Sequence, residues 1–115
     1  MATDSYIAYD ISITRQEGDT GSIVITVPDI ISLADFTVIK FHVFRSGSTI
    51  ISKELGDSSG TLNVAGQVIT IDLEPDDTKG YKGTNRWELE ISGNSDNEVI
   101  TIGKGDLIII KERIV

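Results

Sequence analysis

The sequence of 115 residues contains no cysteine, a single histidine, a single tryptophan and two prolines. Without cysteine the chain can form neither a disulfide nor a thiolate metal site, so thiol redox chemistry is excluded. Because His42 is the only histidine, a metal site built on two histidines is excluded, and we assign His42 a structural or neutral role. The absence of cysteine also agrees with assembly in a reducing cytosol.

Long apolar runs and an excess of positive charge are missing as well. No run of about 18 apolar residues occurs, so neither a membrane-spanning helix nor a membrane partner is predicted. The first ten residues lack the basic-then-apolar pattern of a signal peptide, and we expect no export through such a leader. The 10 basic residues are outnumbered by 18 acidic ones, which gives a net charge of −8. Such a chain repels phosphate backbones, so nucleic acid is not an expected partner.

What the chain does contain is β-branched residues in period-two alternation, separated by turns rich in glycine, aspartate, asparagine and serine. Alternation of this kind is typical of strands with one face on a core and the other in water. Residues 1–115 are expected to form one domain. The predicted strands are Ile7–Arg15, Thr20–Val27, Phe36–Arg45, Thr49–Leu55, a short strand that begins at Leu62, Gln67–Leu73, Asn85–Ser92, Glu98–Gly103 and Asp106–Arg113. The pattern predicts an all-β, antiparallel, immunoglobulin-like β-sandwich with Greek-key connections and about eight strands. A closed barrel is the structural alternative.

The candidate residues for chemistry are few, and each has a structural interpretation. Trp87 lies on the inward face of its strand and is expected to anchor the core. Asp76 and Asp77 follow Pro75, so one carboxylate is expected to cap a single helical turn by accepting a backbone N–H two or three residues on; a calcium site is the alternative. Asn94–Glu98 is interpreted as a hairpin tip, with a calcium loop as the alternative. No catalytic, cofactor-binding or metal-binding residue is predicted, and an enzyme is not expected.

Two apolar segments are candidates for a protein interface. The strand that begins at Asp106 is apolar on both faces, and the crossing segment Asp29–Asp35 is apolar enough to lie against an edge of the sandwich. Unpaired edges and exposed apolar patches are where a partner adds. A strand buried at the centre of a sheet explains the same pattern. The candidate interface residues are Ile30, Ile31, Leu33, Leu107, Ile108, Ile109, Ile110, Ile114 and Val115.

Four stretches carry a family resemblance: DISITRQEGDTGSIVITV, FTVIKFHVFRSG, VAGQVITIDLEPDDTKGYKGTNRWELEI and VITIGKGDLIII. Together they resemble the N-terminal domain of bacteriophage baseplate upper proteins and related small tail or neck components. The resemblance implies a virion structural protein of the tail, baseplate or neck that acts through protein–protein assembly contacts. It further implies other phage structural proteins as partners, a homo-oligomer in the assembly, and a place in the virion after assembly in the host cytoplasm.

The sequence is compatible with a second function. A carbohydrate- or surface-binding β-sandwich module, such as a capsid decoration or adhesin domain, has the same strand pattern. Binding of sugars favours two or three aromatic residues exposed on one face, and the tyrosines of this sequence are too scattered for such a row to be assembled from the pattern alone.

Overall fold

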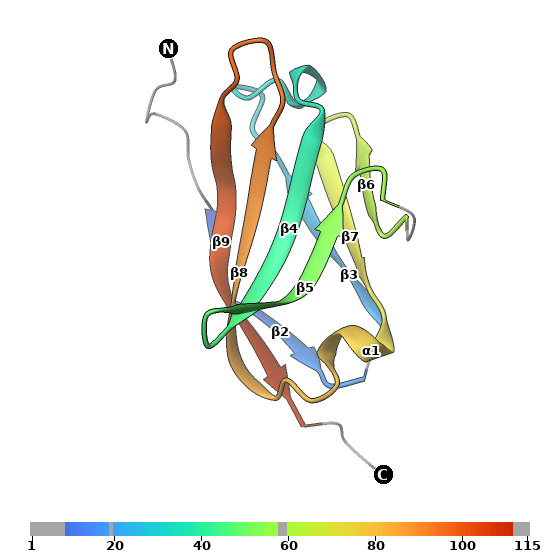
Figure 1. Ribbon diagram of the computed structural model, residues 1–115. Helices are drawn as coiled ribbons and strands as arrows, with labels where there is room; N and C mark the ends of the chain where they lie inside the picture. The colour runs from blue at the N-terminus through green and yellow to red at the C-terminus, as the bar shows by residue number, and fades with distance from the viewer. Residues whose placement is uncertain (1–8, 19, 58–59, 112–115) are drawn as a thin grey trace.

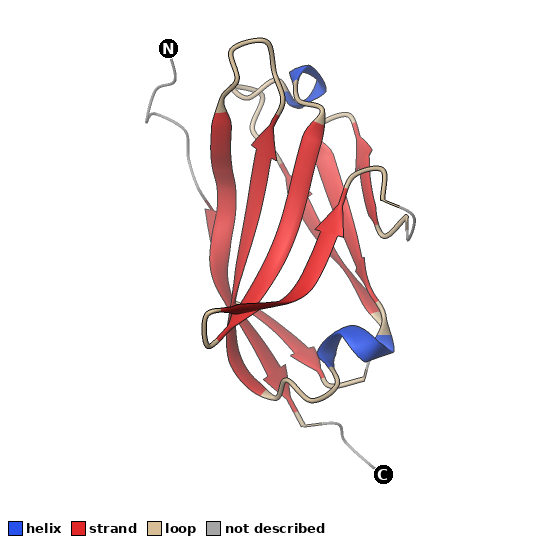
Figure 2. Cartoon of the chain, in the orientation of Figure 1, coloured by secondary structure: helices blue, strands red, loops and turns tan. Residues whose placement is uncertain are grey.

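Two β-sheets packed face to face make up the computed structural model, which describes residues 9–18, 20–57 and 60–111 (Figure 1). Strands dominate the fold, and two short helical turns lie at opposite ends of the sandwich (Figure 2). In chain order the elements are β1 (Tyr9–Asp10), β2 (Ile13–Gln16), β3 (Gly21–Thr26), the 3-10 turn η1 (Leu33–Asp35), β4 (Val38–Arg45), β5 (Ser48–Glu54), β6 (Leu62–Ala65), β7 (Val68–Leu73), α1 (Pro75–Thr78), β8 (Gly83–Ser92) and β9 (Val99–Ile110). The predicted β-sandwich is confirmed, and the closed barrel is not what forms.

The two sheets differ in width. The larger one has the strand order β1-β9-β8-β4-β5, with β2 also paired to β9, whereas the smaller one has the order β3-β7-β6. In Figure 1 the larger sheet lies in front and β3 and β7 lie behind it. A layer of three strands cannot cover a layer that is five strands wide, so part of the inner face of the larger sheet meets no strand of the smaller one.

Alternating aliphatic side chains from both sheets fill the core. Ile23, Ile25 and Val27 are buried from the smaller sheet, as the alternation predicted. Trp87 has no exposed surface and stacks on Phe41, with ring centroids 5.9 Å apart. The predicted core anchor is therefore confirmed. Offset stacking of two buried aromatic rings adds to the stabilisation that burial provides.

The N-terminal strand departs from the predicted pattern in two ways. It pairs with β9 in parallel, not antiparallel, and it is interrupted between Asp10 and Ile13. The predicted strand began at Ile7, which lies outside the described residues. Ile11 has the same position in the alternation as Ile13, but it is 45% exposed. The chain arches over Gly105 at this point, and a Cβ atom on Gly105 would overlap the backbone of Ile11.

The last two predicted strands form one. β9 runs as one strand through Gly103-Lys104-Gly105, where the glycines had indicated a bulge or bend, and its register against β8 shifts directly before Gly103. The glycines instead allow close approach: a Cβ atom on Gly103 would lie 2.8 Å from the ring of Trp87. Gly103 thus makes room for the large indole, and Gly105 makes room for the N-terminal strand. Glycine in a strand often marks such a close approach.

The crossing segment between β3 and β4 is held by one side chain. The amide of Gln67 donates to the carbonyl of Ile31 at 2.7 Å and accepts from the N–H of Leu33 at 3.0 Å. Ile31 and Leu33 are both buried, so this segment closes one end of the core. Neither helical turn in the described ranges is long or apolar enough to cross a membrane.

A candidate binding groove between two free sheet edges

The two sheets leave their edges unpaired on the same side of the sandwich. Strand β3 pairs only with β7 among the described strands, and β1 and β2 pair only with β9. Strands β2 and β3 follow each other in the chain but belong to different sheets, so the seam between the sheets runs between them. An unpaired edge presents a row of backbone N–H and C=O groups that another chain can bind.

The direction of the backbone groups on β3 follows from two hydrogen bonds. The N–H of Val27 donates to the carbonyl of Gln67 on the β7 side, at 2.7 Å. The carbonyl of Ser22 points the other way and accepts from Arg15 at 2.8 Å. Because successive residues of a strand point their backbone groups to opposite sides, Val24 directs both its N–H and its C=O to the open edge. No hydrogen bond within the described ranges joins either group.

Arg15 joins the two edges at one end of the seam. Its guanidinium donates to the carbonyl of Thr14 on β2 at 3.0 Å and to the carbonyl of Ser22 on β3 at 2.8 Å. The N–H of Ile11 donates to the carbonyl of Lys104 on β9. Because the backbone groups of successive residues point to opposite sides of a strand, the carbonyl of Thr14, three residues on, points away from β9. Arg15 therefore bridges carbonyls that face outward from both sheets, and it protects this end of the β3 edge.

Beyond Arg15 the seam widens into a groove of about 300 Å³. An adjoining hollow of about 280 Å³ continues along the edge of β3. The groove is lined by Ile11, Ser12, Ile13, Thr14, Arg15, Ile23, Val24, Ile25 and Trp87. We call this set the edge groove. Its rim carries two exposed apolar side chains, Val24 at 60% and Ile11 at 45%.

The floor of the edge groove is fixed by the indole of Trp87. Its Nε1–H donates to the carbonyl of Ile11 at 2.9 Å, which gives the buried indole its partner and holds the arch of the N-terminal strand over Gly105. The lining holds a single cation, Arg15, and no acid. It therefore offers apolar contact and backbone hydrogen bonds, but no pair of a nucleophile and a base for a reaction.

A second hollow, of about 220 Å³, lies at the end of the sandwich between the crossing segment and the tip of the β8–β9 hairpin. Its acidic residues include Asp35, Asp96 and Glu98. The tip is a hydrogen-bonded hairpin, as predicted: Asn94 donates to the carboxylate of Glu98 at 2.8 Å and accepts from its N–H at 2.9 Å. In the described part of the chain no three His, Cys, Asp or Glu side chains gather in a way that could hold a metal ion.

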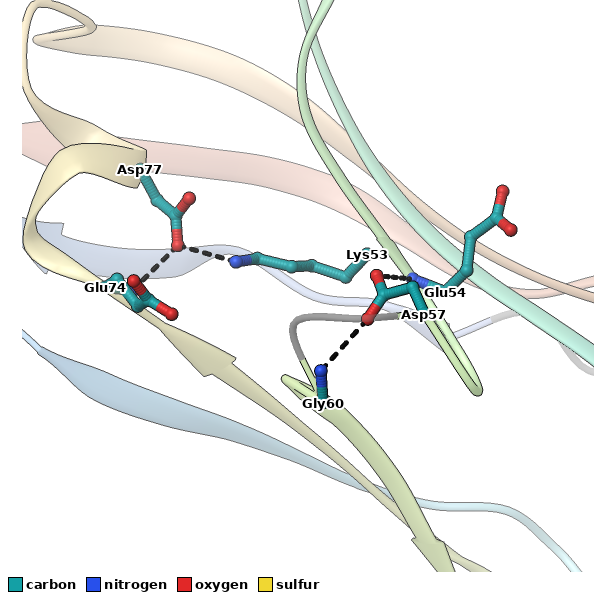
Figure 3. Close-up of polar contacts among 6 residues, drawn as sticks. All are labelled: Lys53, Glu54, Asp57, Gly60, Glu74 and Asp77. Carbon is teal, nitrogen blue, oxygen red and sulfur yellow. Dashed lines mark hydrogen bonds and ion pairs between the residues drawn. The ribbon is translucent and has the colours of Figure 1, made fainter.

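The Asp76–Asp77 corner forms the predicted single helical turn, but the side chain that accepts an N–H three residues on is that of Glu74 and not of an aspartate. The carboxylate of Asp77 accepts from the N–H of Glu74, three residues back, at 2.7 Å. The same oxygen lies 2.9 Å from the ammonium group of Lys53 (Figure 3). A lysine thus provides the positive charge beside this carboxylate. Lys53 takes an inward position on β5 with its side chain only 8% exposed, against 21% for Asp77.

This ion pair leads to an asymmetric prediction for stability. In Asp77→Asn the buried ammonium of Lys53 loses its counter-charge, and we expect the free energy of unfolding to fall by about 2–4 kcal/mol. In Lys53→Met the carboxylate of Asp77 keeps its hydrogen bond from the N–H of Glu74 and its contact with water. We expect the free energy of unfolding to fall by about 1–2 kcal/mol. Urea denaturation of both variants measures the difference. The exposed pair Lys79–Asp76 supplies the control, since Lys79→Met is expected to change nothing measurable. Equal losses in the first two variants would contradict the assignment.

The predicted interface residues fall into four groups. Ile31, Leu33, Leu107 and Ile109 belong to the core. Ile108 is half-buried on the outer face of β9, whereas Ile30 and Ile110 are 69% and 41% exposed. Ile114 and Val115 lie outside the described residues. Strand β9 is interior to the larger sheet, so its two-sided apolar pattern has a structural cause, and an interface at Ile30 and Ile110 stays a prediction.

The single histidine, also singled out in the sequence, lies away from the edge groove. His42 is half-buried on the outer face of β4, edge-to-face with Phe44 at 6.0 Å between ring centroids. Trp87 and Phe41 are in the core, and they contribute nothing to an exposed aromatic row. Sequence reasoning missed the edge groove itself. The Gly-x-Gly step of β9 marks where the N-terminal strand arches, but from the sequence alone it does not distinguish such an arch from a bend.

Comparisons with known proteins give the fold alone. No family model matches the chain, and no curated protein matches it. Among solved structures it is similar to CopC from Methylosinus trichosporium OB3b, with a TM-score of 0.52 and 12% sequence identity over 94% of this chain and 89% of that one. At this identity the likeness supports the β-sandwich and carries no residue of CopC over to this chain.

The same comparison corrects the predicted function. The structural neighbour reported above, CopC, is not described as a phage protein. The predicted role as a virion structural protein of the tail, baseplate or neck is therefore wrong, and so is the predicted location in the virion. The motifs that supported the resemblance are mostly strand-and-turn patterns, which many β-sandwiches share. What the comparison establishes is a β-sandwich of the architecture that CopC also has.

Proposed function

We propose that this chain is a non-catalytic binding domain that holds a partner protein at its edge groove. The observation that carries the proposal is the free edge of β3 at Val24, where an exposed apolar side chain and two outward backbone groups lie beside the edge groove and its apolar adjoining hollow. Native proteins usually protect such edges with charge, proline or a covering segment. Here Arg15 protects only one end.

The dimensions of the edge groove favour a protein over a small molecule. Its volume of about 300 Å³ is at the lower limit of sites that enclose small ligands, which span roughly 300–1,000 Å³. The groove is also open along the sheet edge and continues into the adjoining hollow beside Thr26. An elongated, open site of this kind gives a small ligand few walls, but it gives a polypeptide a continuous track.

The predicted homo-oligomer stays a prediction. Two copies that met at this edge would bring together two chains of net charge −8, and like charges oppose such an encounter at low salt. Sedimentation equilibrium at several concentrations decides whether copies associate. If they do, the dissociation constant is expected to fall as salt is raised, because screening weakens the repulsion.

The proposal is tested with two valine-to-lysine variants. Val24→Lys places a charge on the edge groove, whereas Val99→Lys changes a valine of similar exposure, 64% against 60%, at the start of β9 and outside the groove lining. Each protein is immobilised and incubated with a lysate of the cells that produce it. Bound proteins are then quantified by mass spectrometry. We expect at least one protein to be retained by the wild type and by Val99→Lys but reduced about tenfold or more on Val24→Lys. Identical retention on all three, or none on the wild type, would contradict the proposal.

A further inference from the structure

We infer that the occupant of the edge groove is an extended polypeptide segment of a partner protein. It adds to β3 as a fourth strand, with apolar residues at alternate positions and basic residues at its flanks. The inference rests on the proposed function and makes it specific. It combines three observations: the outward backbone groups of Val24, the unequal widths of the two sheets, and the acidic character of the chain.

The backbone of β3 has hydrogen-bonding groups on its open side that a further strand can bind. Val24 lies in the middle of Gly21–Thr26, and its N–H and C=O point to the open side. A partner strand alongside would donate to the carbonyl and accept from the N–H of this one residue, which forms one hydrogen-bonded pair of a sheet ladder. Ser22 could add a further pair, but its carbonyl is occupied by Arg15 at 2.8 Å.

The difference in sheet width explains why a strand fits here. The smaller sheet ends at β3, whereas the larger one continues through β9 to β1 and β2. A fourth strand beside β3 would extend the smaller sheet over the edge groove. Every second side chain of that strand would then point inward, toward Trp87 and between Ile13 and Ile23. These inward positions favour apolar residues, because the side chains that they would face, Trp87, Ile13 and Ile23, are apolar or aromatic.

The acidic character of this chain favours basic residues on either side of the apolar segment of the partner. The chain carries 18 acidic against 10 basic residues. Asp72 lies beside the start of β3, where it accepts from the hydroxyl of Ser22 at 2.7 Å, and the exposed Asp29 follows its end. Basic residues before and after the inserted segment would meet these carboxylates. A second copy of this chain would bring further negative charge, so a cationic partner segment is favoured over self-association.

The test uses a synthetic peptide of sequence Lys-Thr-Ile-Thr-Val-Thr-Lys as the probe. Its charge-reversed control has glutamate at both ends, and calorimetry measures both. We expect the basic peptide to bind at least about tenfold more tightly than the acidic one at low salt. Val24→Pro removes the outward N–H but no bond to β7, so it is expected to weaken binding about tenfold or more, whereas Val24→Thr keeps the N–H and is expected to change it by less than about threefold.

A measurement on the wild type tests strand addition even if Val24→Pro does not fold. Hydrogen exchange followed by NMR is expected to show the amide of Val24 exchanging fast in the free protein and at least about tenfold more slowly with the basic peptide bound. Unchanged exchange at saturating peptide would overturn strand addition. So would a dimer, seen by light scattering without peptide, that Val24→Pro abolishes, because the occupant would then be a second copy.

The peptide-binding test and the capture test can give different results, and each result bears on a different proposal. If neither peptide binds while Val24→Lys still loses its captured protein, the strand mode is wrong and the binding site stands. If capture does not depend on Val24 at all, the proposed function itself fails.

Discussion

Replacing Trp87 with alanine is expected to lower the free energy of unfolding by about 4 kcal/mol. The indole has no exposed surface, stacks on Phe41, and lies against Gly103. Its removal leaves a cavity in the centre of the core that a glycine neighbour cannot fill. Domains of this size are stable by only about 5–15 kcal/mol, so urea denaturation will show a large fall in the transition midpoint.

The variant Trp87→Phe distinguishes the stability contributed by ring packing from the stability contributed by the indole hydrogen bond. The phenyl ring keeps most of the packing on Phe41, but the carbonyl of Ile11 loses the donor that lies 2.9 Å away. We expect a loss of about 1–3 kcal/mol, clearly smaller than that of Trp87→Ala. An alanine variant no less stable than the phenylalanine one would contradict the central role of the ring.

Gly105→Ala is expected to cost about 3 kcal/mol or more and to release the N-terminal strand from β9. The added Cβ atom would overlap the carbonyl of Ile11, and Gly105 has a φ of +151° that other residues rarely adopt. The backbone of Ile11 must move, and this movement breaks its hydrogen bond to Lys104, which is 3.0 Å long. Urea denaturation measures the loss, and hydrogen exchange at the Ile11 amide is expected to accelerate.

The matched control for Gly105 is Gly47→Ala. Gly47 has a φ of +82° but no heavy atom within 4 Å of the added Cβ, so it reports backbone strain alone, about 1–2 kcal/mol. If both alanine variants lost the same stability, the close approach of Ile11 to β9 would have no energetic weight.

Much of the strand pattern could be predicted from local alternation. Ile23 and Ile25 face the core as their spacing predicted, because burial of one face imposes a period of two on a strand. The direction of the N-terminal strand could not be predicted in this way. Parallel pairing of Ile13 with Leu107 joins residues far apart in the sequence, and nothing in the local pattern encodes their relative direction.

Glycine was the least informative signal. At Gly103 and Gly105 it indicated a break in the strand, but the strand is continuous and the missing side chains make room for Trp87 and Ile11. A sequence cannot distinguish a bend from a close approach, because both need the same absence of a Cβ atom.

The edge groove and the buried ion pair depend on tertiary arrangement. Val24 has the alternation of any outward residue, and its importance comes only from the position of β3 at an edge. Arg15 likewise has a role only because its carbonyl partners belong to two different sheets. Lys53 did carry a local signal, since it follows the buried Ile51 by two residues and so takes an inward position on β5. An inward lysine requires an acid nearby, and Asp77 supplies it.

The hydrogen bond from Trp87 to Ile11 gives the protein a built-in optical reporter. The chain has a single tryptophan, and its indole forms the floor of the edge groove, 2.9 Å from a carbonyl at the rim. All intrinsic tryptophan fluorescence therefore originates at that floor. A segment that enters the groove and shifts the arch of Ile11 will change the emission, so occupancy can be followed by fluorescence without any attached dye.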